Sequence, residues 1–269
     1  KRSHRSLLLS SCLLWALSPS LFAEVRMPYA KSGLSRTEAA AHLLSRLRFG
    51  ASPGEVERVA QMGPEKWFES QLKPVPDPEL HSRLRQLSTY SMSASDIGST
   101  FMPNQVVARK AEQAGVIQMR DKEKLKNDPA TREKVADFAR SQNFRPEREL
   151  MAETIEQKLV HTVHSKNQLE EVLTDFWYNH FYVSMAKNQA KDFILSYERD
   201  AIRPNSLGTF RQLLGSSSSH PAMLYYLDNA QSSKNPEQGN QMNQGAKGKP
   251  KKRAKTGLNE NYAREILEL

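Results

Sequence analysis

The chain has 269 residues, 38% of them hydrophobic, so its length permits a sizeable apolar core. Its formal net charge of +9 is confined to two segments, the first five residues and residues 231–257. All other residues together carry equal numbers of basic and acidic side chains, so the charge does not indicate a folded basic groove of the kind that binds nucleic acid. The single cysteine, Cys12, lies in the leader described next, which excludes disulfides and thiolate metal sites from the rest of the chain.

Residues 1–23 have the three parts of a secretory signal peptide. A basic start is followed by an apolar run from Leu7 to Leu17 and by a small residue, Ala23, at the expected cleavage position. The apolar run is too short to cross a bilayer. A lipoprotein signal at Cys12 is the alternative, but apolar residues continue beyond that cysteine. The leader therefore predicts a periplasmic or secreted protein with no membrane span after cleavage.

Residues 24–269 are predicted to form a single helical domain of the all-α class. The first helix is expected after Ser35, because Ser35 and Glu38 have the spacing of a capping box. Residues 52–55 have the same spacing and predict a second helix with Pro53 in its first position. Gly63 and the proline after it predict the end of that helix and the start of a third. The apolar rhythm continues to the last residue without a stop signal, so the domain is expected to be incomplete.

Two segments stand apart from this pattern. Residues 104–142 are highly charged and poor in large apolar side chains, which predicts exposed helices or an insertion rather than core. Residues 231–257 are rich in Gly, Asn, Gln and Lys, which predicts a disordered loop. The lysines of this loop have no interleaved aromatic residues for base stacking, so we expect no nucleic-acid partner.

The strongest helical rhythm runs from residue 148 to residue 184, with a predicted break near residues 165–167. His180 lies within the apolar stripe of the second of these helices, so we expect it to be buried among aromatic residues. Asp175 and Asn179 lie one turn apart at the edge of the same stripe.

The last helical segment has a similar anomaly, because Glu265 falls on its apolar face. A carboxylate there needs a hydrogen-bond donor, a cation or a metal. In one interpretation, His180 and Glu265 are buried polar residues that fix helix packing. In the other, they converge as ligands of a divalent metal or as an acid/base pair, positioned by Asp175 or Asn179.

The remaining histidines suggest structural roles. His161 and His164 have no carboxylate at a zinc-motif position and are interpreted as surface or packing residues. His220 precedes Pro221 at a predicted helix start, so it is expected to be a capping or loop residue.

Five ordered stretches resemble one bacterial family of large exported proteins, the "domain of unknown function 1800" group. They include the signatures Trp-x-Asn-His-Phe at Trp177 to Phe181 and Asn-x-Asn-Tyr-Ala-Arg-Glu at Asn259 to Glu265. The full stretches are residues 42–50, 173–181, 197–204, 220–229 and 259–269.

This resemblance covers about residues 36–269 and implies a mostly helical, secreted or periplasmic protein whose family continues into a second half. It brings no assigned reaction. We expect a structural or interaction role at the cell envelope, with another exported protein as partner. The alternative is a metal-dependent or acid/base hydrolytic enzyme of the envelope that uses His180 and Glu265.

Overall fold

The computed structural model describes residues 25–118, 128–185, 187, 190–232 and 258–268. Within these ranges the regular structure is helical except for two short strands, β1 (Phe101–Met102) and β2 (Arg145–Pro146), so the predicted all-α class is confirmed. The predicted signal peptide and nearly all of the predicted loop at 231–257 lie outside the described residues.

Three helices form the N-terminal part of the fold: α1 (Arg36–Leu47), α2 (Glu55–Met62) and α3 (Pro64–Gln71). The predicted capping box before α1 is present, since the Ser35 hydroxyl accepts from the Glu38 amide and the Glu38 carboxylate accepts from the Ser35 amide. Gly63 separates α2 from α3 as predicted, with a φ of 105° that favours glycine. The three helices share an apolar cluster of Ala40, Leu44, Val59, Ala60 and Trp67.

The start of α2 differs from the prediction. Gly54 has a φ of 71°, and the helix begins only at Glu55, so Pro53 is not its first residue. Half of the expected capping box forms, because the Glu55 carboxylate accepts from the Ser52 amide at 2.7 Å. The Ser52 hydroxyl instead accepts from Arg48, whose guanidinium also pairs with Glu55. Arg48, the residue that follows α1, therefore occupies the hydroxyl that was expected to cap α2.

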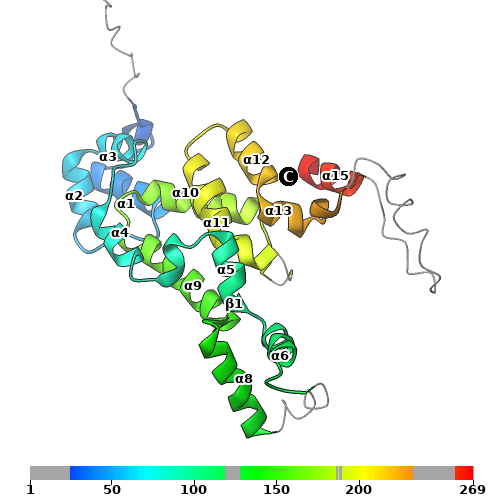
Figure 1. Cartoon of the computed structure of the whole chain (residues 1–269). Coiled ribbons are helices and arrows are strands. Elements are labelled where there is room, and N and C mark those ends of the chain that lie inside the picture. Colours follow the sequence, from blue (N-terminus) through cyan, green and yellow to red (C-terminus); the bar gives the residue numbers. More distant parts are fainter. Residues whose placement is uncertain (1–24, 119–127, 186, 188–189, 233–257, 269) are drawn as a thin grey trace, which may run out of the picture.

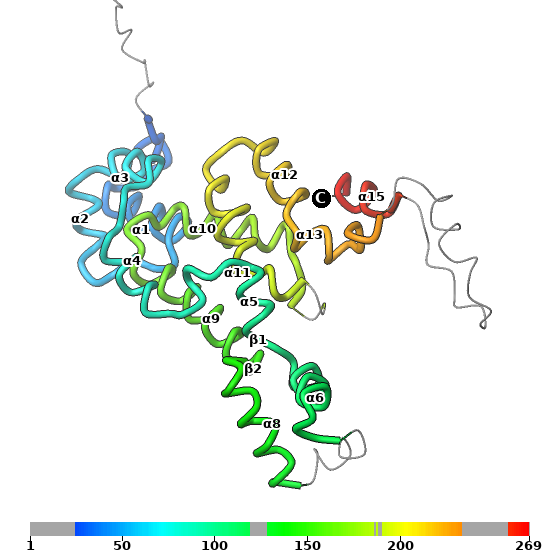
Figure 2. The backbone as a smooth tube through the Cα atoms, in the orientation of Figure 1, coloured from blue at the N-terminus to red at the C-terminus, as the bar shows by residue number. Residues whose placement is uncertain are grey.

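The charged segment at 104–142 projects from the rest of the molecule (Figure 1). The chain reaches it through α4 (Pro78–Leu84) and α5 (Ala94–Thr100), and the segment contains α6 (Asn104–Gln113) and α8 (Pro129–Ser141). Figure 2 shows β1 and β2 side by side at its base, where they pair in parallel. The two helices enclose a small apolar cluster that includes Val107, Ala111, Ile117 and Val135. We call α6 and α8 the arm.

The predicted break near residues 165–167 is confirmed, because α9 (Glu147–His164) ends and α10 (Gln168–His180) begins on either side of it. Beyond α10 the chain forms a series of short helices around a second core. They are η4 (Ala190–Phe193), α11 (Ile194–Ser196), a π-helical turn at Tyr197–Ile202, η6 (Arg203–Asn205), α12 (Phe210–Ser219), α13 (Pro221–Tyr226), η7 (Asn229–Gln231) and α15 (Glu260–Glu268). Two more short 3-10 helices are η1 (Pro28–Ala30) and η2 (Ser88–Ser91).

Tyr197 lies at the centre of this second core and is fully buried. Its hydroxyl donates to the Phe181 carbonyl at 3.0 Å and also bonds the Ser217 hydroxyl, which ties the end of α10 to α12. His220 caps α13, since its Nδ1 accepts from the Ala222 amide at 3.2 Å. The capping role expected for this histidine is thereby confirmed.

None of the helices in the described ranges has the length and apolarity needed to cross a membrane.

Candidate functional site

His180 is the last residue of α10, and its side chain is exposed, so the predicted burial is wrong. Its ring contacts those of Phe176, Trp177 and Phe181, with centroid separations of 6.4, 5.7 and 4.8 Å. The aromatic neighbours are thus those expected, but His180 lies at the outer edge of the group: Phe181 is buried, Trp177 is partly buried, and Phe176 is 55% exposed. The error comes from equating the apolar stripe with the buried face, whereas α10 buries its N-terminal half.

Glu265 is half-buried in α15 and accepts a hydrogen bond from the Asn261 amide group at 3.3 Å. The same helix contacts the core through Tyr262, whose hydroxyl donates to the Ser218 carbonyl. Glu265 therefore has a partner on its own helix, and among the described residues no hydrogen bond or ion pair joins it to His180.

The two residues expected to position this pair also have local partners. Asp175 forms an ion pair with Lys158 at 2.5 Å, and Asn179 is exposed and donates to the Asp175 carbonyl. In the part of the chain that the structure describes, no three His, Cys, Asp or Glu side chains are grouped as metal ligands. A catalytic or metal-binding role for these residues stays a prediction.

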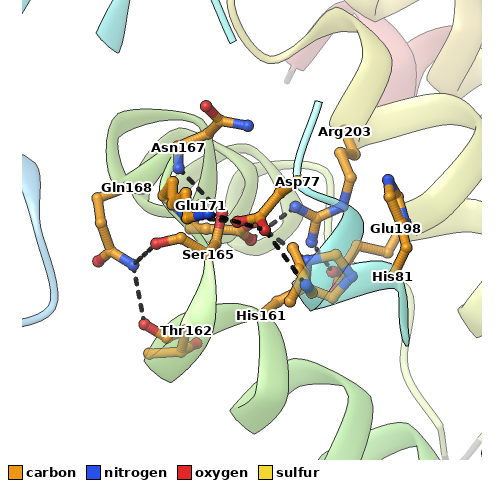
Figure 3. Close-up of polar contacts among 12 residues, drawn as sticks. Asp77, His81, His161, Thr162, Ser165, Asn167, Gln168, Glu171, Glu198 and Arg203 are labelled. Carbon is orange, nitrogen blue, oxygen red and sulfur yellow. Dashed lines mark hydrogen bonds and ion pairs between the residues drawn. The ribbon is translucent and has the colours of Figure 1, made fainter. Parts of the chain in front are cut away.

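The structure instead brings together four ionisable residues from α9, α10 and the turns that follow α11, which we call the Glu171 cluster: His161, Glu171, Glu198 and Arg203 (Figure 3). The Glu171 carboxylate lies at its centre, with one oxygen 3.1 Å from Nδ1 of His161 and the other accepting from Arg203 at 2.6 Å. The second arm of the Arg203 guanidinium donates to Glu198 at 2.8 Å. Only 4% of the Glu171 side chain is exposed, so the charges interact with little solvent screening.

Charge pairing overcomes the cost of burial in this cluster. Burial by itself raises the pKa of Glu171, but the hydrogen bond from His161 and the charge of Arg203 outweigh it and lower that pKa to about 2. Burial by itself lowers the pKa of Arg203, and the carboxylates of Glu171 and Glu198 reverse this effect and raise it. The ion pair is therefore the stable state at neutral pH.

A second set of hydrogen bonds fixes the corner between α9 and α10 next to the cluster (Figure 3). Asp77, which caps α4, also accepts from the Lys166 amide at 3.1 Å. Asn167 bonds both the amide and the carbonyl of Val75. Gln168 donates to two carbonyls at the end of α9 and the turn after it. These contacts hold the segment between α3 and α4 against the α9–α10 corner.

The space beside the Glu171 cluster decides what it can do. The cavity there is lined by the cluster together with Phe49, Lys158 and Thr174 among others, and its volume is about 10 Å³. A volume of that size holds about one water molecule. The paired side chains join α9, α10 and the turn that holds Arg203, so they clamp these three elements together.

Sequence reasoning missed this cluster. His161 was assigned to the surface or to packing, but it is a partner of a buried carboxylate. Glu171 lies in the first turn of α10, where acidic residues are common for reasons of helix charge alone. Arg203 was the available signal, because it lies within one of the stretches that resemble the family and is followed by a proline.

Two exposed apolar surfaces lie outside this cluster. Along α9, four aliphatic side chains at every fourth position are between 47% and 62% exposed, and we call them the α9 stripe: Met151, Ile155, Leu159 and Val163. Around the end of α10, Phe176 and His180 lie beside Trp177 and Phe210, and we call these four residues the aromatic patch. Monomeric proteins expose single apolar residues often, but runs of this kind typically mark contact sites.

The comparisons with known proteins give one result. A family model described as "Protein of unknown function (DUF1800)" matches residues 42–269. Neither the curated proteins nor the solved structures contain a match. The family match includes each of the five stretches on which the resemblance rested, and so the chain belongs to the DUF1800 family of proteins of unknown function.

Proposed function

We propose that this protein is an exported interaction protein of the bacterial envelope, which binds a helix of another exported protein along the α9 stripe. The observation that carries the proposal is the run of Met151, Ile155, Leu159 and Val163 on one side of an 18-residue helix. Each of these four side chains is at least 47% exposed in the presence of all the other described residues.

The spacing of the stripe suits a helical partner. Residues four apart lie above one another on a helix, so the stripe extends over roughly 18 Å at about 1.5 Å per residue. An amphipathic partner helix presents its own apolar residues at the same spacing. Burying the exposed part of each of these aliphatic side chains contributes on the order of 1 kcal/mol, part of which offsets the entropy lost on association.

The aromatic patch supports the same kind of role for the Trp-x-Asn-His-Phe signature. Phe176 and Phe210 are each about half exposed, at 55% and 49%, and the exposed His180 ring is stacked on Phe176. Aromatic side chains are enriched where proteins contact one another. In this proposal the signature residues form a second contact surface.

The compartment is a separate part of the proposal and has its own test. Export by the leader at 1–23 predicts that protein produced in bacteria from its native gene is recovered from the periplasm or the medium with Glu24 as its first residue. Sequencing of the purified N-terminus measures this directly. Recovery from the cytoplasm with the leader intact would show that the leader does not direct export.

The interaction is tested by cross-linking at defined positions in producing cells. A photoreactive amino acid replaces Val163, and the control protein carries it at the exposed Arg211 on α12. We expect one discrete adduct from position 163 and none from position 211. The adduct should disappear in the Ile155→Glu/Leu159→Glu variant, because two charges on the stripe oppose apolar contact.

The protein that is cross-linked to position 163 is then identified and purified, and its binding to this chain tests the proposal. In sedimentation of the two purified proteins, the wild type should form a complex, and the Ile155→Glu/Leu159→Glu variant should sediment as the free chain with an unchanged circular dichroism spectrum. Equal complex formation by the wild type and this variant refutes the proposal, as does an adduct pattern that is the same from positions 163 and 211.

A further inference from the structure

A groove of about 940 Å³ lies in the arm, between α6 and α8 and beside β2. Neither the proposed interaction surface nor the Glu171 cluster involves it. Its walls are largely aliphatic and aromatic, and they include Met102, Val107, Ala108, Val135, Ala136, Ala139 and Phe144. Grooves of about 300 to 1,000 Å³ with such walls are typical of small-molecule sites.

The rim of the groove is strongly basic. Five arginines line it, against one acidic residue, Glu149, which is already paired with Arg145 at 2.9 Å. Arg140 is paired with a neighbouring aspartate on α8. The other three arginines come from α6, α8 and the start of α9, are exposed and form no ion pair with a described residue: Arg109, Arg132 and Arg148.

The wall beneath this rim is held in place by contacts with the body of the protein. The β1–β2 pairing sets Phe101 opposite Arg145 and Met102 opposite Pro146. The Arg145 guanidinium lies 4.7 Å from the centre of the Phe101 ring and donates to Glu153 of α9 at 2.8 Å. Cation–π and ion-pair contacts of this kind fix the base of the arm, where one end of the groove lies.

We propose that the arm groove binds a single-chain amphipathic anion, with an aliphatic tail along the floor and a carboxylate or phosphate head at the rim arginines Arg109, Arg132 and Arg148. The apolar floor favours a hydrocarbon tail. Three guanidinium groups beside it form no ion pair with a described residue, and they favour an anionic head, because arginine pairs with carboxylate and phosphate through two parallel hydrogen bonds. A neutral or cationic amphiphile leaves this positive charge uncompensated.

Binding is measured on the whole chain with a fluorescent fatty-acid analogue, dansylaminoundecanoate, as the probe. We expect saturable binding that dodecanoate and dodecyl phosphate displace and that dodecanol displaces at least about tenfold less well, since a charged pair contributes roughly a factor of ten in affinity. The carboxylate and phosphate competitors distinguish the two sources of the anionic head. Equal displacement by dodecanol overturns the proposal, because it shows that the head is not recognised.

Variants then locate the site. Arg109→Gln/Arg132→Gln should weaken probe binding about tenfold or more. The matched control, Arg36→Gln/Arg211→Gln, removes two exposed arginines from α1 and α12 and should bind as the wild type does. Thermal unfolding of each variant confirms that it is folded.

A filling substitution tests the floor. Ala136 is half-buried in the groove wall, so Ala136→Trp places an indole in the groove and should abolish probe binding while the protein remains folded. Unchanged affinity in both the arginine and tryptophan variants overturns the proposal. Binding of an acidic amphipathic peptide in the groove, without binding of dodecanoate, also overturns the proposal. The Ile155→Glu/Leu159→Glu variant should retain the probe site, so this inference and the proposed function fail independently.

Discussion

Neutralising Glu171 should remove most of the stability that its cluster provides. The carboxyl group has a pKa of about 2 in the folded protein against an ordinary value of 4.5, a difference that corresponds to roughly 3 kcal/mol at neutral pH. Glu171→Gln keeps the shape of the side chain and removes its charge. We therefore expect the free energy of unfolding to fall by on the order of 3 kcal/mol.

Urea unfolding followed by circular dichroism measures this loss, and Glu79→Gln is the matched control. Glu79 also pairs with an arginine, Arg83 at 3.2 Å, but its side chain is 67% exposed. Water and salt screen such a surface pair, so its loss should cost less than about 0.5 kcal/mol. Equal effects of the two substitutions would contradict the reasoning, because burial would then have no influence on the strength of the pair.

The pH dependence of the free energy of unfolding tests whether the lost stability comes from the charge of Glu171. The pKa of Glu171 is lowered on folding, so its contribution is fully present above 4.5 and is lost as pH falls toward about 2. The difference between the wild type and Glu171→Gln should therefore be constant near neutral pH and fall to less than half at about pH 3. A difference that stays constant down to that pH would show that the lost stability does not come from the carboxylate charge.

Three further changes test other parts of the fold. Burial lowers the pKa of His220, so the unfolded chain takes up the proton first as pH falls, and the protein loses stability between about pH 7 and 5. His220→Asn should keep the helix cap and reduce this loss, measured by thermal unfolding. Tyr197→Phe removes a hydroxyl that bonds Phe181 and Ser217, and should cost roughly 1 to 3 kcal/mol in urea unfolding, whereas no loss would show that these buried groups find other partners. Gly63→Ala should cost on the order of 1 kcal/mol or more in the same assay, because alanine rarely adopts a φ of 105°, and a neutral result would mean that the turn adjusts.

The sequence by itself determined several helix boundaries. The Ser35 cap, the Gly63 boundary, the break before α10 and the His220 cap all depend on a residue and its near neighbours, so local chemistry suffices to predict them. The start of α2 was mispredicted because Arg48 donates to the Ser52 hydroxyl that was expected to cap the helix, and a contact from outside the four-residue pattern is not visible in it.

Only the tertiary structure decided which polar residues lie inside. His180 has the periodicity of a core residue but lies at the surface, because burial of a helix face depends on what packs against it and not on its apolar content alone. Glu171 and Arg203 have no apolar pattern that marks them as buried, yet they meet in the interior. Charges 32 residues apart stabilise one another only after the chain brings them within hydrogen-bonding distance and excludes water around them, and a linear pattern records neither condition.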